Sequence, residues 1–188
     1  MKHIILALVI STAATAAAHA QDKDADLIEG YRTNAFTGMV PGEIDGLSVG
    51  EIATDPDAHT LRAFYGNDDK SREAMVMIYL DRSPTPAAVT DPAAAIDRAI
   101  ASLEGGLQQK NLEGERRDLT SPNNKSMTCV DAEQVPGKLL FSYCSSVVKG
   151  RMIAVQTLSS MARKDHAALR TENDDFAGQM IDHVDQAK

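Results

Sequence analysis

The segment that sets the architecture of this chain is Glu73-Ala74-Met75-Val76-Met77-Ile78-Tyr79-Leu80. Successive side chains of a strand point to opposite faces of a sheet, so the even-numbered residues, all aliphatic, share one face. Met75, Met77 and Tyr79 share the other face. A strand that is apolar on both faces is typical of the centre of a sheet with cover on each side. The pattern therefore predicts a central strand over residues 73–80.

Two helices are predicted after this strand. The first covers about residues 91–104, because Asp91 can act as an N-cap, Pro92 suits the first turn, and Gly105-Gly106 interrupts the apolar spacing. The second covers residues 160–186, where apolar residues recur at helical spacing in one amphipathic helix or a broken pair. Each helix has one apolar stripe to bury against a sheet.

Further segments show the patterns of strands. They lie at residues 46–52, 60–65, 112–119, 127–132, 139–148 and 151–158. Lys149-Gly150 joins the last two as a tight turn, since glycine tolerates a positive φ. The element order predicts an α+β fold: one mainly antiparallel sheet, with its central strand at 73–80, covered by helices at about 91–104 and 160–186.

Residues 1–20 are typical of an export signal. Lys2 gives a basic start, residues 4–10 are apolar, and Ala18-His19-Ala20 is a small-x-small cleavage site. The apolar run is too short to cross a bilayer core of roughly 30 Å, so we expect cleavage after Ala20 and a periplasmic or secreted protein. The mature chain then has a loose lead-in over residues 21–41 and a single α+β domain over residues 42–188.

The chain has two cysteines, Cys129 and Cys144. An even count in an exported chain indicates a disulfide rather than a metal site. Their midpoint falls between Pro136 and Gly137, so a symmetric hairpin closed by that turn would place the two cysteines opposite each other on neighbouring strands. The alternatives are free thiols, an intermolecular bond and a redox-active pair, of which the last would be expected to have C-x-x-C spacing at a helix start. We predict a structural disulfide.

The excess of acidic over basic side chains limits the kinds of partner that the protein can bind. The chain has 19 basic and 27 acidic side chains, a net charge of −8, which disfavours nucleic acid and anionic lipid surfaces. It has no Trp, four Phe and four Tyr, too few for an aromatic stacking platform. The acidity either keeps an exported protein in solution or offers a face to a basic partner, so an inhibitor or immunity-type protein is one alternative function.

No metal or cofactor site is predicted. His59, His166 and His183 do not share the i, i+3 or i, i+4 spacing of metal ligands on one helix face. The acidic run at residues 22–26 begins like a calcium-binding EF-hand loop, but it lacks the required glycine and the final bidentate carboxylate. Neither a phosphate-binding glycine loop nor a dinucleotide fingerprint is present.

One catalytic motif remains as an alternative. Gly46-Leu47-Ser48-Val49-Gly50 matches G-x-S-x-G, in which the serine sits on a strained turn between a strand and a helix. Here the residues after Gly50 indicate a strand that runs into a turn. A small serine hydrolase that uses Ser48 is therefore a second alternative function, with His59, His166 or His183 as the only bases available in residues 21–188.

The element order resembles that of the small α/β sandwich proteins that include Mog1, PsbP and DcrB. The resemblance runs from Leu47-Ser48-Val49 through the Asp91-Pro92 helix to the terminal helix with Phe176 and Met180. It rests on element order and patterning. DcrB is periplasmic, and the resemblance implies a non-enzymatic accessory or binding role without assigning a role to any residue.

The leading functional prediction concerns Met75, Met77 and Tyr79. Methionine serves both as adaptable core filler and as a soft surface for varied partners. These residues are therefore either covered by a helix or exposed in an apolar groove. We expect a periplasmic accessory protein without catalytic activity, which binds another envelope or secreted protein, or a small apolar ligand, through this face or an adjoining groove.

Overall fold

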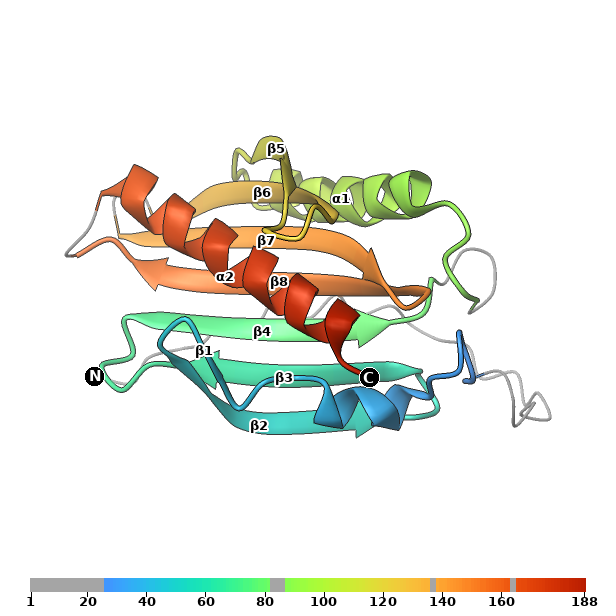
Figure 1. Cartoon of the computed structure of the whole chain (residues 1–188). Coiled ribbons are helices and arrows are strands. Elements are labelled where there is room, and N and C mark those ends of the chain that lie inside the picture. The colour runs from blue at the N-terminus through green and yellow to red at the C-terminus, as the bar shows by residue number, and fades with distance from the viewer. Residues whose placement is uncertain (1–25, 82–86, 136–137, 163–164) are drawn as a thin grey trace.

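The computed structural model describes residues 26–81, 87–135, 138–162 and 165–188 (Figure 1). Three of the segments interpreted above lie outside these ranges. They are the expected leader at 1–20, the start of the acidic run at 22–25, and the Pro136-Gly137 turn.

Within the described residues, eight strands form one antiparallel sheet in the order β1-β2-β3-β4-β8-β7-β6-β5. The strands are β1 (Glu43–Ile44), β2 (Leu47–Asp55), β3 (Thr60–Gly66), β4 (Arg72–Tyr79), β5 (Glu115–Thr120), β6 (Ser126–Val135), β7 (Leu139–Val148) and β8 (Arg151–Ser160). The predicted strand at 73–80 is β4, which lies between β3 and β8 near the middle of the sheet. The α+β fold and the central strand are therefore confirmed.

The helices begin and end where local signals and packing together dictate. They are the 3-10 helix η1 (Thr33–Gly38), α1 (Pro92–Gln109) and α2 (His166–Gln186). The Asp91 carboxylate caps α1 by accepting a hydrogen bond from the backbone N–H of Ala94 at 3.1 Å. α1 continues past Gly105-Gly106, where we expected it to end, because Leu107 extends its buried stripe. α2 is one helix, and it starts only at His166 because β8 extends through Ser160.

The two long helices lie on opposite faces of the sheet (Figure 1). α2 crosses one face diagonally, and its Phe176 and Met180 share a core with Val76 and Ile78 of β4. α1 lies on the other face, where Ile100 shares a separate core with residues of β6, β7 and β8. Alternate residues of each strand therefore enter different cores, as the period of two requires.

The N-terminal segment is packed rather than loose over its described part. Arg151, at the start of β8, has no exposed surface. Its Nη2 donates to the Asp26 carbonyl at 2.7 Å and to the Asp26 carboxylate at 3.1 Å, and its guanidinium lies 5.3 Å from the ring centroid of the buried Phe36. The expected loose lead-in at 21–41 thus differs from the structure, because ionic and aromatic contacts fasten residues 26–40 to the sheet.

The Asp26 carboxylate is the polar centre of this attachment. Burial alone would raise the pKa of Asp26, but hydrogen bonds from Thr33, Arg151 and His59 outweigh it and hold the pKa below its ordinary value. Burial also lowers the pKa of Arg151, which the hydrogen bond and charge of Asp26 partly offset. His59 brings the turn between β2 and β3 into the same cluster, with Nδ1 3.2 Å from Asp26 Oδ1. One carboxylate therefore joins three parts of the chain.

Candidate functional site

The sheet surface on the α1 side is covered over one half and uncovered over the other. α1 packs on β6 and β7. Within the described residues, no helix packs on the same side of β2 or β3, because the buried residues of η1 and α2 belong to the opposite core. We call the surface that continues from the margin of the α1 core onto β3 the open face and define it by the exposed Phe64 of β3 and the half-buried Met75, Met77 and Tyr79 of β4.

Strand register brings the open face together. Phe64 lies directly opposite Met75, and Arg62 lies opposite Met77. Residues that face each other across neighbouring strands point to the same side of the sheet. The structure therefore places the predicted residues Met75, Met77 and Tyr79 on one surface and adds Phe64 to them.

The two strands of this surface differ in exposure. Met77 and Tyr79 pack against the margin of the α1 core, so the helix reaches them only in part. Met75 is half-buried, and Phe64 is 40 % exposed. The same strand buries Val76 completely on the α2 side. The cover expected on both sides of β4 is thus complete on the α2 side and marginal on the α1 side.

The width of the elements explains why the surface stays open. Neighbouring strands lie about 4.8 Å apart, and a helix with its side chains is about 10 Å across, so one helix covers about two strands. α1 covers β6 and β7. The strands on the far side of β8 need a second helix on that side, which the described residues do not provide.

Polar groups fix the boundary between the covered and open parts. Tyr143, on β7, is buried beneath α1, and burial raises its pKa, with a hydrogen bond that involves Tyr79 partly offsetting the rise. The Tyr79 ring therefore lies on the open face while its hydroxyl is tied into the covered half. This bond holds one side of the open face in a fixed position.

A disulfide joins Cys129 of β6 to Cys144 of β7, as predicted. The two residues are register partners with Cα atoms 4.0 Å apart, the close spacing of directly opposed residues. Both are buried in the core beneath α2. The bond therefore lies in the covered half of the sheet and on the opposite side from the open face.

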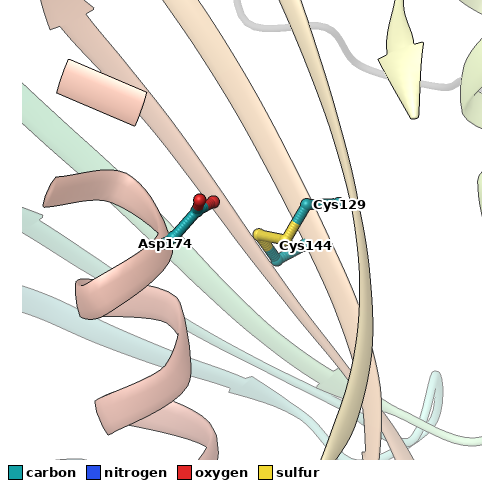
Figure 2. A group of neighbouring side chains, drawn as sticks. All are labelled: Cys129, Cys144 and Asp174. Atoms are coloured by element: carbon teal, nitrogen blue, oxygen red, sulfur yellow. A yellow bond between two sulfur atoms is a disulfide. The ribbon is translucent and has the colours of Figure 1, made fainter. Parts of the chain in front are cut away.

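Figure 2 shows the one group among the described residues whose atoms are spaced like metal ligands: Cys129, Cys144 and Asp174. This group does not suit a metal ion, because cysteine binds metals as a thiolate and both sulfur atoms here form the disulfide bond. The Asp174 carboxylate accepts hydrogen bonds from Arg117 at 2.6 and 2.9 Å. Arg117 also donates to the buried Asp131, so the group belongs to an ion network that ties β5 and β6 to α2.

The arrangement around Ser48 does not form a nucleophile elbow. Ser48 lies within β2, paired with Glu43 and Gly66, and the strand continues to Asp55 instead of turning into a helix. Its neighbour Leu47 is buried on the α2 side, so Ser48 points to the other side, away from both histidines of α2. His59 lies beyond the far end of β2, roughly 23 Å along the strand.

A shallow depression of 350 Å³ lies elsewhere, between β1, the loop after β5 and the last turns of α2. Ile44, Asn123 and His183 are among its lining residues, and none of its lining residues belongs to the open face. Its buried Asp182 accepts hydrogen bonds from the Ser121 hydroxyl and from the backbone N–H of Asn123 at 2.9 Å. That carboxylate therefore clamps helix to loop and is not available to a ligand.

Sequence reasoning missed Phe64, the most exposed apolar residue of the open face. Residues 60–65 were predicted as a strand, but their pattern does not say which residues pair with β4. Register alone places Phe64 beside Met75. The alternation of buried and exposed residues from Leu61 to Tyr65 is visible only once the neighbouring strands are known.

Comparison with known proteins finds no protein-family model that matches the chain and no matching curated protein. Among the described residues, no helix combines the length and the apolar character that a membrane span requires. The open face is therefore the feature of the molecule from which we infer a function.

Proposed function

We propose that the chain is an exported accessory protein that binds another envelope or secreted protein through the open face. One observation carries the proposal: Phe64, Met75, Met77 and Tyr79 gather apolar side chains on one sheet surface, beside Arg62, and the described residues leave this surface partly uncovered. Apolar surface that remains exposed in a folded chain marks a site of interaction more often than a packing fault.

The chemistry of the open face suits a protein segment. Methionine side chains are flexible and polarizable, so they adapt to the shape of a partner, while Phe64 supplies a rigid aromatic anchor. A small apolar ligand, the other occupant we considered, is usually held in a concave pocket. The depression described above lies elsewhere, which favours the protein partner.

Export is part of the proposal. It is supported by the leader-like pattern of residues 1–20 and by the disulfide, which persists in oxidising compartments. The resemblance of the sequence to the Mog1, PsbP and DcrB sandwich proteins implies a binding role and is part of the proposal.

The experiment compares partner recovery by two variants. The protein would be immobilised after purification from cells that express the full chain, with its N-terminus defined by intact mass. Met75→Asp with Met77→Asp places two charges on the open face. Gln108→Glu with Gln109→Glu adds the same charge at the exposed end of α1, far from that face, and serves as the matched control.

We expect the wild type and the control to recover the same protein from envelope extract, and the open-face variant to lose it by at least about tenfold, since buried unpaired charge opposes docking. Equal recovery by the open-face variant, with its fold retained, would refute the proposal. Recovery that instead falls steeply with salt and ignores both methionines would favour the inhibitor or immunity-type alternative.

A further inference from the structure

Among the described residues, the outer edge of β2 is paired only at its start. β1 is two residues long and pairs with β2 only at Leu47 and Ser48. Beyond Val49, whose N–H donates to Gly42 at 2.8 Å, the described residues form no other backbone hydrogen bond to the outer side of β2. Residues 50–55 therefore have β3 as their single strand neighbour, and all but the partly buried Ile52 are exposed.

A bulge decides which backbone groups point outward. Leu47 and Ile44 flank a two-residue turn, so the backbone groups of Leu47, and by alternation those of Val49, point to the outer side. The register shifts by one residue between Val49 and Glu51, and a shift of this kind inverts the alternation. The N–H and C=O of Ile52 and Thr54 therefore point to the unpaired edge.

On the side of the open face, β2 carries two acidic side chains, Glu51 and Asp55, and the one basic side chain beside them is Arg62 of β3, opposite Ala53. Glu51 is opposite Phe64, and Asp55 is opposite Thr60, so Glu51, Ala53 and Asp55 share the side of the sheet on which Phe64 lies. A second copy of this chain is a poor occupant. In the antiparallel register centred on Ala53, Glu51 would face Asp55 of the copy, and like charges directly opposed are unfavourable.

We propose that this edge binds an extended segment of a partner protein as an additional antiparallel strand, with basic side chains opposite Glu51 and Asp55. The inference rests on the proposed function, because it identifies the partner segment that reaches the open face. Backbone bonds to Ile52 and Thr54 supply affinity, and the alternate side chains supply selectivity. A residue opposite Ala53 lies on the same side of the sheet as Phe64, and the small Ala53 side chain, which Arg62 faces from β3, leaves room there for an apolar side chain.

The probe is a fluorescein-labelled peptide, blocked at both ends, with the core Lys-Thr-Val-Val-Lys. In the antiparallel register its lysines oppose Asp55 and Glu51, and its central valine opposes Ala53. Binding is measured by fluorescence anisotropy against the purified protein. Control peptides replace both lysines by glutamate, or carry N-methyl groups on the second and fourth residues, which removes the donors that face β2 and leaves the protein unaltered.

Thr54→Pro and Thr54→Ala are the matched protein variants. Both remove the hydroxyl, but only proline removes the outward N–H, and an edge strand tolerates proline where its N–H faces solvent. We expect Thr54→Ala to bind the peptide like the wild type and Thr54→Pro to bind about tenfold more weakly. Glu51→Gln with Asp55→Asn should weaken binding about fivefold and flatten its salt dependence.

No binding of the lysine peptide, equal binding of its N-methylated form, or equal binding by Thr54→Pro would overturn the inference. Equal binding of the glutamate peptide would overturn its charge assignment. Failure here is distinct from failure of the proposed function. If partner recovery depends on Met75 and Met77 but the peptide binds Thr54→Pro as well as wild type, only the edge-strand proposal is rejected. If the peptide binds as expected but partner recovery is unchanged by substitution of both methionines, the open face is rejected as the binding surface.

Discussion

The two halves of the sheet differ in how they are covered. β6, β7 and β8 lie between α1 and α2, and this half of the sheet contains the disulfide and the ion network around Asp131. β2, β3 and β4 have cover on the α2 side from η1, β1 and the end of α2, and little cover on the α1 side. The first half is therefore packed on both sides, while the half made of β2, β3 and β4 has an apolar surface on its α1 side and packing beneath it.

This contrast shows how a small chain can hold a binding surface in place. A free apolar sheet would aggregate or change register, but β4 is hydrogen-bonded along its length to β8, which belongs to the covered half. The covered half thus stabilises the strand on which the open face is built. Stability and binding should respond to mutations in different halves, which the following measurements test in order of expected effect.

The largest effect should come from the α1 core. Ile100→Ala empties a site with no exposed surface and should lower the free energy of unfolding by about 4 kcal/mol. The matched change in the open half, Met75→Ala, removes a half-buried side chain and should cost about 1 kcal/mol. Urea unfolding of both variants measures the difference. Similar losses would mean that the open face is packed like a core.

Loss of the disulfide should come next. Cys129→Ala with Cys144→Ala opens a loop with a sequence separation of 15 and should lower the free energy of unfolding by about 3 kcal/mol. For a domain of this size the melting temperature should fall by about 6 to 12 °C. Binding through the open face should persist at temperatures where the variant is folded. Lost binding by a folded variant would show that the halves are not independent.

A smaller, pH-dependent effect should come from the N-terminal attachment beneath the open half. Asp26→Asn keeps the shape of the side chain but removes the charge that pairs with the buried Arg151, and should cost about 1 to 2 kcal/mol at pH 7. Because the folded-state pKa of Asp26 is depressed, its contribution is complete above the unfolded pKa of about 3.9 and is lost as the pH falls through the folded value.

Unfolding curves of the wild type and Asp26→Asn between pH 7 and pH 2.5 measure this contribution. The two proteins should differ above about pH 5 and converge as the pH falls well below about 3.9. A difference that stays constant with pH would show that the Asp26 charge does not hold the segment.

Local sequence signals predicted the parts of the fold that depend on local chemistry. Alternation at residues 73–80 predicted β4, Asp91-Pro92 predicted the start of α1, and the spacing of Cys129 and Cys144 matched a hairpin. β1 was not predicted from the sequence, because two residues are too few to show a pattern. Asp45 and Gly46, which precede β2, have the positive φ values of a tight turn. The end of α1 was predicted too early, because tertiary packing overrides the low helix propensity of glycine.

The features that attach the N-terminal segment and those that make the candidate site are long-range. Arg151 finds Asp26 across 125 residues, and no local pattern indicates that pair. The open face exists because β8 returns beside β4 while α1 covers β6 and β7, a choice of strand order that residues 73–80 do not encode. Met75, Met77 and Tyr79 could be assigned to one side of a strand, but whether a helix covers that side depends on strand order and sheet width.

The contrast between the halves is tested most directly by methionine oxidation with dilute hydrogen peroxide, read out peptide by peptide by mass spectrometry. Methionines lie in both halves: Met75 on the open face is half-buried, whereas Met152 and Met180 are 2 % and 0 % exposed in the two cores. The account predicts that Met75 oxidises at least about tenfold faster than Met152 and Met180, and that the bound partner removes this difference. Equal protection of all three methionines in the isolated protein would contradict it.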